Sequence, residues 1–262
     1  DVYKRQSFLC LLLAVVSCAA FFSGACANEL PSTLKPQVNE RAVYDWNGRH
    51  KAVMERNRSV NPEYAVFSDS ITHRWGGEPS GDNRGLGTGK EAWKNLFSPH
   101  TVTNMGFGSD YVDNAYYRVQ LGELDGISPR VIIVLLGTNN LGGRKDTPQS
   151  CADNLKAFVS LVGRKCPASK ILLLGILPRK EKAVAPLIVE TNKMISVLAD
   201  GKRVFFANPG TAFLAEDGVS PKSGLLVDGL HPSAAGYDVL GKELSSLLEK
   251  IDGRYKGGSV VR

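Results

Sequence analysis

Two short segments, far apart in the sequence, carry side chains that could break an ester bond. One reads Asp228-Gly229-Leu230-His231-Pro232, and the other, Ser68-Asp69-Ser70-Ile71-Thr72, follows an apolar run. A serine hydroxyl is a poor nucleophile at neutral pH, so it needs an imidazole to take its proton and a carboxylate to orient that imidazole. Ser70, His231 and Asp228 supply these groups and together predict serine hydrolase chemistry.

Acyl transfer also needs hydrogen-bond donors directed at the negative oxygen of the tetrahedral intermediate. The side-chain amide of Asn139 is one candidate, and the backbone N–H groups of Ser70 and Ser109 are two more. This chemistry requires no metal ion and no cofactor, so we expect neither.

Apolar patterning indicates the elements that must position these residues. Short apolar runs, each followed by a polar or glycine-bearing turn, occupy residues 64–67, 102–107, 131–136, 170–177 and 204–207. Segments with helical apolar spacing lie at residues 40–57, 92–97, 112–121, 152–162, 187–198 and 234–248. The alternation predicts an α/β fold, a three-layer α/β/α sandwich around an open parallel sheet of about five strands.

In open parallel sheets, ligands bind where the carboxyl ends of the strands converge. Ser70 follows the first apolar run, Ser109 the second and Asn139 the third, while Asp228 and His231 precede the last helical segment. We therefore expect these side chains to meet at one edge of the sheet. The glycine-rich residues 76–89, directly after the serine turn, are either one wall of a substrate cleft or a solvated loop without a role.

The first residues resemble an export signal. Lys4 and Arg5 precede an apolar stretch, and small residues follow it. We interpret residues 1–27 as this signal and residues 28–262 as a single domain, with a tail at 251–262 whose glycine and charge predict disorder. The protein is then secreted or periplasmic, without a membrane span. Alternatively, a lipobox-like segment ending at Cys18 predicts a lipid-anchored cell-envelope lipoprotein.

Composition narrows the range of partners. The formal net charge is +6, but the lysines and arginines are scattered, so we expect no nucleic-acid partner.

Outside the predicted signal, Cys151 and Cys166 share one helical segment, which places them ~20 Å apart, beyond the reach of a disulfide. Neither cysteine belongs to a CxxC motif or a Cys/His cluster, so zinc and thiol redox chemistry are not expected. The oligomeric state is not predicted.

The chemical segments form an ordered set of blocks that resembles a known family, the SGNH or GDSL-type hydrolases, and within it the platelet-activating-factor acetylhydrolase catalytic subunits. The blocks are residues 68–72, 104–110, 137–140 and 228–232, with supporting stretches at 122–127 and 174–179. The resemblance implies a flavodoxin-like sheet, with Ser70 as nucleophile, His231 as base and Asp228 as its orienting partner. It also implies an oxyanion hole formed by Ser70, Ser109 and Asn139.

Two positions depart from the pattern of that family, because Ser68 and Ser109 stand where it usually has glycine. The donor at position 109 is a backbone N–H, which serine supplies equally well unless the turn demands a positive φ. A Cβ at position 109 would also narrow the space beside the scissile carbonyl. This favours a small acyl group such as acetyl.

Other motifs do not fit. Residues 85–90 lack the spacing of a phosphate-binding loop, and the GxSxG elbow of the α/β-hydrolases is absent from the sequence. His50, His73 and His100 have no suitably spaced carboxylate and are expected to be structural or solvent-facing.

For an exported esterase, acetyl groups on carbohydrates are abundant targets, so a glycan or other small ester is the preferred substrate. One alternative is a lipid or phospholipid esterase, which predicts an apolar channel and a preference for longer acyl chains. The other alternative, motivated by Ser68 and Ser109, is a catalytically silent carbohydrate-binding protein.

Overall fold

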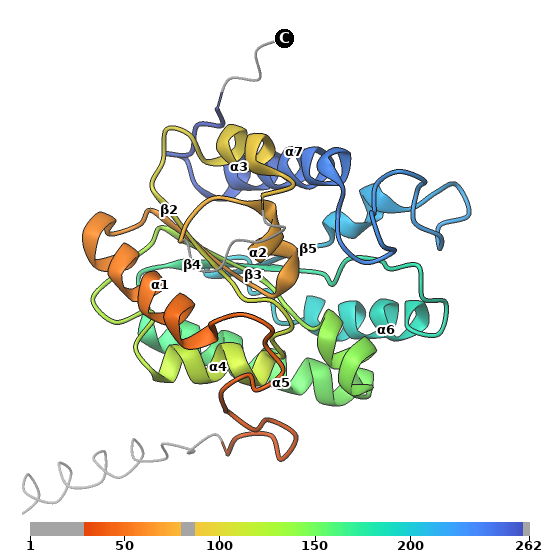
Figure 1. The fold of residues 1–262 in the computed structure, drawn as a ribbon, viewed down its shortest axis with the longest axis horizontal. Coiled ribbons are helices and arrows are strands. Elements are labelled where there is room, and N and C mark those ends of the chain that lie inside the picture. The colour runs from red at the N-terminus through yellow and green to blue at the C-terminus, as the bar shows by residue number, and fades with distance from the viewer. Residues whose placement is uncertain (1–28, 80–86, 259–262) are drawn as a thin grey trace, which may run out of the picture. The chain divides into compact units, whose positions relative to one another are not determined.

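The structure of the chain, a computed structural model, describes residues 29–79 and 87–258 (Figure 1). The predicted export signal with Cys18 lies outside the described residues, as do residues 80–86 of the glycine-rich segment, so the proposed cleft wall stays a prediction. The chain divides into a short unit, Asp1–Leu30, and a larger unit, Pro31–Arg262. All features described below belong to the larger unit.

Five strands form one parallel sheet in the order β2-β1-β3-β4-β5. They are β1 (Tyr64–Ser68), β2 (Val102–Gly106), β3 (Val131–Leu135), β4 (Lys170–Leu174) and β5 (Val204–Ala207). Phe67 lies opposite Met105 of β2 and Val134 of β3, so β1 and its two neighbours end at one level. The strand order changes direction between β1 and β3, the position where open α/β sheets hold their ligands.

Helices cover both faces of this sheet (Figure 1). One layer holds α1 (Trp46–Val60), α4 (Val112–Gln120), α5 (Pro148–Lys165) and α6 (Ala185–Ser196), and the other holds α2 (Ser70–Trp75), α3 (Lys90–Phe97) and α7 (Ala234–Ile251). Strand side chains alternate between the two cores, with Ala65 and Phe67 packed in the first and Tyr64 and Val66 in the second. The predicted three-layer sandwich is confirmed.

The observed elements differ from the predicted ones at several places. The helix expected over residues 40–57 begins at Trp46, because the Asp45 carboxylate accepts a hydrogen bond from the Gly48 N–H at 2.8 Å and caps it. A turn is predicted at residues 68–72, but Ser70 begins α2 (Ser70–Trp75), a helix too short for apolar periodicity to reveal. Two further short helices, η1 (Asn140–Arg144) and η2 (Pro209–Phe213), follow β3 and β5.

Residues 252–258 correct the expectation of disorder after residue 250. The Tyr255 ring is buried, and its hydroxyl donates to the Leu96 carbonyl at 2.7 Å. The Asp252 carboxylate accepts hydrogen bonds from the Tyr64 hydroxyl at 2.5 Å and from Arg130 at 2.8 Å. One aromatic anchor and one carboxylate thus fix a segment that its composition alone predicts to be disordered.

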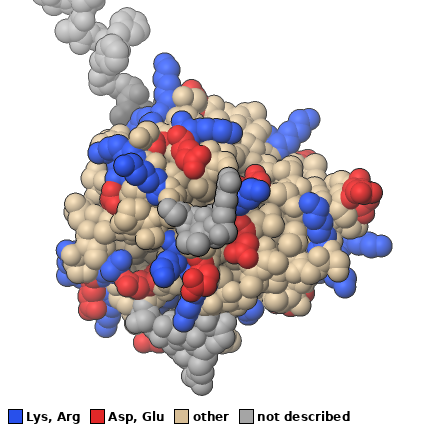
Figure 2. All heavy atoms as spheres, turned by 90° about the horizontal axis from the view of Figure 1, so that it is seen from above, with Lys and Arg blue, Asp and Glu red and all other residues tan. Residues whose placement is uncertain are grey.

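Four features of the described residues concern possible partners and redox chemistry: helix length, metal ligands, thiols and surface charge. Within residues 29–79 and 87–258, no helix is long and apolar enough to cross a membrane, and no group of three or more His, Cys, Asp or Glu could hold a metal ion. Cys151 and Cys166 are free and buried, and burial raises the pKa of both thiols. On the face that Figure 2 presents, basic and acidic side chains are interspersed.

A buried cluster of charged side chains joins α1, α4 and the turn after β2. The fully buried Arg118 guanidinium pairs with Asp110 at 3.0 Å and with Glu123. His50 binds the second oxygen of Glu123 at 2.8 Å. Burial raises the pKa of Asp110 to about 6, against the opposing effect of Arg118. The cluster therefore depends on all of its partners being present.

We expect Arg118→Met to lower the free energy of unfolding by about 3–5 kcal/mol, because two buried carboxylates lose their counter-ion. Urea unfolding measures this change. The matched control is Lys165→Met, which removes a surface salt bridge to Asp125 and should change the free energy of unfolding by less than about 1 kcal/mol. Equal effects of the two substitutions would contradict the importance of the buried cluster.

Candidate active site

Ser70, His231 and Asp228 form a continuous hydrogen-bonded chain, which we call the triad. His231 Nε2 lies 2.8 Å from Ser70 Oγ, and His231 Nδ1 lies 2.6 Å from Asp228 Oδ2. An ionised carboxylate only accepts hydrogen bonds, so Nδ1 carries the ring proton and Nε2 accepts from the serine hydroxyl. The structure thus brings together three residues that the sequence predicts, although 161 residues separate the serine from the histidine.

Two local turns present the triad at the carboxyl edge of the sheet. Ser70 is the first residue of α2, directly after β1, and the Asp69 carboxylate caps this helix by accepting from the Ile71 N–H at 2.9 Å. Asp228 Oδ1 accepts from the N–H groups of Leu230, at 3.0 Å, and His231, at 2.8 Å. One oxygen of Asp228 therefore folds the loop, and the other orients the imidazole.

The electrostatics of the triad favour a neutral imidazole beside an ionised carboxylate. Burial lowers the pKa of His231 and the nearby Arg74 charge lowers it further, while the hydrogen bond to Asp228 opposes both. Partial burial acts to raise the pKa of Asp228, but hydrogen bonds from His231 and Leu230 outweigh it and hold this pKa at about 2. A guanidinium nitrogen of Arg74 lies 3.8 Å from Asp228 Oδ2. A neutral imidazole is the form that accepts a proton.

Ser109 has a left-handed backbone conformation, with a φ of 63°. The turn after β2 therefore demands the positive φ that glycine adopts without cost, and serine adopts it under strain. Within the part of the chain that the structure describes, neither the Ser109 N–H nor the Ser70 N–H donates a hydrogen bond. Both N–H groups are available to a ligand.

Asn139 lies on the other side of the serine strand, after β3. Since β2 and β3 flank β1, Ser109 and Asn139 follow the strands on either side of Ser70. The Asn139 amide nitrogen donates to the Asp110 carbonyl at 3.0 Å, which leaves its second N–H for a ligand. The residues predicted for an oxyanion hole thus follow three adjacent strands.

Ser68, the other departure from the family pattern, has a different environment. It is the last residue of β1, where the extended backbone suits any side chain, and it is fully buried. Its carbonyl accepts the Phe107 N–H at 3.0 Å. Its hydroxyl has no hydrogen-bond partner in the described residues. Serine is therefore accommodated here without backbone strain.

His73, expected to be structural or solvent-facing, and residues 39–44, most of them expected in a helix, border the Ser109 turn. His73 Nδ1 accepts the Gly108 N–H at 3.0 Å, and the Tyr44 ring packs edge-on against the imidazole, with centroids 4.9 Å apart. No sequence pattern reveals such contacts, because a hydrogen bond to a distant backbone group leaves no periodicity or motif. Arg74, also in α2, lies half-exposed beside Asp228.

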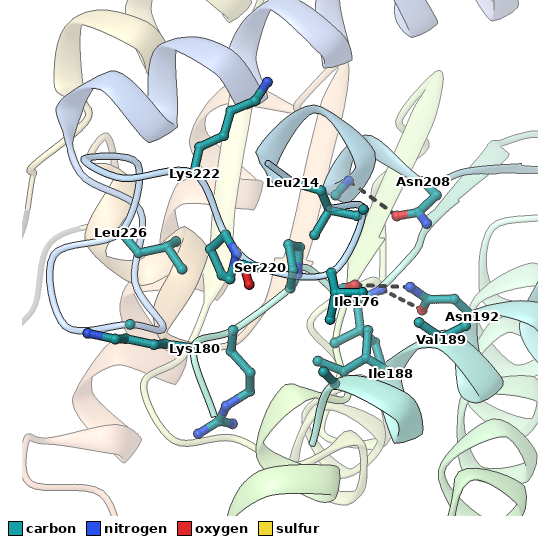
Figure 3. Close-up of a pocket in the computed structure, with 18 of the residues that line it drawn as sticks. Ile176, Lys180, Ile188, Val189, Asn192, Asn208, Leu214, Ser220, Lys222 and Leu226 are labelled. Atoms are coloured by element: carbon teal, nitrogen blue, oxygen red, sulfur yellow. Dashed lines mark hydrogen bonds between the residues drawn. The ribbon is translucent and has the colours of Figure 1, made fainter. Parts of the chain in front are cut away.

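A groove of about 1670 Å³ lies on the Asp228 side of the triad, between α6 and the segments that follow β4 and β5 (Figure 3). Its apolar side chains include Ile176, Ile188, Val189, Leu214 and Leu226. Lysines, among them Lys180 and Lys222, also line it, and Asp228 is the triad residue that borders it. The groove offers an apolar surface with basic side chains next to the candidate active site.

Comparison with known proteins places this combination of fold and site in one class. The model of the GDSL-like Lipase/Acylhydrolase family matches residues 69–239, a span that includes the triad. The human platelet-activating factor acetylhydrolase IB subunit alpha2 is 32% identical over 225 residues, covering 82% of this chain and 91% of that protein. The human alpha1 subunit is 29% identical over 211 residues, covering 79% and 84%.

A solved structure with a similar fold is Est24, a carbohydrate acetylesterase from Sinorhizobium meliloti. Its TM-score is 0.54 at 18% identity, over 71% of this chain and 98% of that chain. The chain belongs to the GDSL-like lipase/acylhydrolase family, and it is a serine ester hydrolase. The family resemblance of the sequence blocks is confirmed.

We expect Ser109→Gly to raise the free energy of unfolding by about 0.5–1 kcal/mol. Relief of the left-handed strain contributes ~1–2 kcal/mol, and the greater freedom of glycine in the unfolded chain removes ~0.5–1 kcal/mol of that gain. Urea unfolding measures the difference. The same change at Ser160, inside α5, should instead lower the free energy of unfolding by about 0.5 kcal/mol. A loss of stability in Ser109→Gly would show that the turn is not strained.

Proposed function

We propose that this protein is an exported serine esterase that removes acetyl or other short acyl groups from carbohydrate esters through an acyl-enzyme. The observation that carries the proposal is the hydrogen-bonded triad, with 2.8 Å between Ser70 Oγ and His231 Nε2 and 2.6 Å between His231 Nδ1 and Asp228 Oδ2. This is the arrangement that activates a serine hydroxyl for attack on a carbonyl carbon.

In this mechanism Ser70 Oγ attacks the ester carbonyl while His231 Nε2 takes the hydroxyl proton. The imidazolium, stabilised by Asp228, then gives this proton to the leaving alcohol, and an acyl-serine remains. Water, deprotonated by the same imidazole, attacks the acyl-serine and releases the acid. The N–H groups of Ser70, Ser109 and Asn139 stabilise the oxyanion in both steps.

Three observations support a short acyl group on a carbohydrate. The Cβ at position 109 occupies space beside the carbonyl that glycine would leave open, which favours acetyl over longer chains. Residues 1–27 resemble an export signal, and acetylated glycans are abundant ester substrates outside the cell. Est24, a carbohydrate acetylesterase, has a similar fold.

The groove supports a second candidate, a lipid or phospholipid esterase. Its apolar lining beside Asp228 is the kind of channel that a lipid substrate requires, and the human relatives are named as platelet-activating factor acetylhydrolases. In that case the apolar part of the substrate lies in the groove, and its ester reaches Ser70 from the Asp228 side.

Turnover of p-nitrophenyl acetate, p-nitrophenyl octanoate and acetylated xylan, by the protein and by Ser70→Ala, tests both candidates. We expect Ser70→Ala to reduce kcat by about 10⁴-fold or more, and the unmutated protein to prefer acetyl over octanoyl esters and to deacetylate xylan. Faster cleavage of octanoate without release of acetate from xylan favours the lipid esterase. Absence of turnover on every ester would instead favour a silent carbohydrate-binding protein.

The pH dependence of kcat/KM reports the proposed base. Activity requires neutral His231, whose pKa is lowered from its ordinary value of 6.5, so we expect the acid limb to have its midpoint below pH 6.5. Arg74→Gln removes a positive charge that disfavours the imidazolium, so the pKa of His231 rises and the acid limb moves to higher pH. Lys156→Gln, on the distant helix α5, is the control and should leave the profile unchanged. An acid limb that stays in place in Arg74→Gln would refute the assignment.

A further inference from the structure

The direction of the Ser109 N–H is set by the peptide group that joins Gly108 to Ser109. A trans peptide is planar, so its N–H and its C=O point to opposite sides. Any group that holds the Gly108 carbonyl therefore also directs the Ser109 N–H. This N–H has no acceptor among the residues of the described ranges, and its direction decides whether it can bind an oxyanion.

Three side chains that precede α1 donate hydrogen bonds to the carbonyls on either side of this N–H. The Tyr44 hydroxyl and the Asn39 amide lie 3.2 Å and 3.3 Å from the Gly108 carbonyl oxygen. The Arg41 guanidinium lies 2.7 Å from the Ser109 carbonyl oxygen. We call these three side chains the clamp. They hold both peptide groups that flank the left-handed residue.

The clamp also fixes the end of the turn. The Asn39 amide lies 3.0 Å from the Asp110 carboxylate, and the Trp46 indole N–H donates to the same carboxylate oxygen at 2.9 Å. Asp110 is in turn paired with Arg118. These contacts attach the segment before α1 to the buried charge cluster through Asp110, which restrains the clamp.

The N–H of Gly108, which belongs to the preceding peptide group, is held by a residue of α2. His73, in α2, accepts the Gly108 N–H at 3.0 Å through Nδ1, which an imidazolium could not do. Burial, with the charges of Arg49 and Arg74, lowers the pKa of His73 to about 3. At neutral pH the His73 imidazole is therefore neutral and can accept this hydrogen bond. Because α2 begins with Ser70, the nucleophile and the turn share one support.

We propose that Asn39, Arg41 and Tyr44 are positioning residues, which hold the Gly108–Ser109 peptide so that the Ser109 N–H is directed at the oxyanion. The inference rests on the proposed function, since it takes Ser109 as an oxyanion donor. A serine disfavours the left-handed conformation by a factor on the order of ten, and the clamp opposes this preference. Without the clamp the peptide rotates toward a negative φ, and the N–H leaves the oxyanion position.

Tyr44→Phe and Arg41→Met each remove donors and retain the apolar bulk of the side chain. We expect each to lower kcat for p-nitrophenyl acetate by about 3- to 10-fold and the double variant by about 30-fold, less than the roughly 10²- to 10³-fold loss of an entire oxyanion donor. KM should stay within about twofold, because the clamp does not contact the bound ester in its ground state. The unfolding midpoint should change little.

Two matched controls separate positioning from a general loss of hydrogen bonds. Tyr255→Phe removes a hydroxyl that also donates to a backbone carbonyl, at Leu96, far from the triad. Arg58→Met removes a surface guanidinium on α1 that donates to the Met54 carbonyl. Both should retain kcat. The dissociation constant of a boronic acid, which forms a tetrahedral adduct with an active-site serine, should rise in Tyr44→Phe by the same factor by which kcat/KM falls.

The Ser109→Gly background provides the test that a merely structural role would not pass. Glycine adopts a positive φ readily, so the turn no longer needs the clamp, and adding Tyr44→Phe to Ser109→Gly should lower kcat by less than about twofold. An equal loss in both backgrounds overturns the proposal. It is also overturned if the Tyr44 and Arg41 variants keep full kcat while Asn139→Ala loses it. That result would support the oxyanion hole and show that the clamp does not position it. Full turnover by Ser70→Ala instead overturns the proposed function, and the clamp with it.

Discussion

The buried Arg118 guanidinium is the interaction on which the site depends. It takes the Asp110 carboxylate on one side and the Glu123 carboxylate on the other, and it donates to the Met105 carbonyl of β2 at 3.2 Å. A guanidinium without exposure to water is stable only where such partners surround it. Since Asp110 follows Ser109, the charge cluster attaches the candidate oxyanion turn to the core.

The turns that carry Ser70 and Ser109 in the candidate site are short. Ser70 opens a helix directly after β1, and Ser109 lies between β2 and α4. Each turn is tied by side-chain hydrogen bonds to a neighbouring element. The loop before α7 is longer, and there the Asp228 carboxylate accepts two backbone N–H groups and so folds its own surroundings. Rigid support of this kind is what preorganised hydrogen-bond donors require.

Much of this arrangement is predictable from the sequence. The apolar runs identify all five strands, because a parallel sheet that is covered on both faces needs nearly continuous apolar residues. The order of the blocks then places Ser70, Ser109 and Asn139 at one edge. The φ of Ser109 could not be predicted from its residue type, which argues against this conformation; only the glycine that the family usually has at this position indicates it. The contacts of residues 39–44 were not predictable either, since their acceptors lie 64 to 69 residues away.

Because the triad residues lie far apart in the sequence, enzymatic activity can report on folding. Ser70 and His231 stand 161 positions apart in the sequence, so their contact requires both ends of the domain to be in place. Closing so long a loop is among the late and slow events of folding. Hydrolysis of a chromogenic ester therefore reports completion of the native topology, whereas helix content reports only local order. Comparing the two signals during refolding would time the assembly of the sheet edge without any added label.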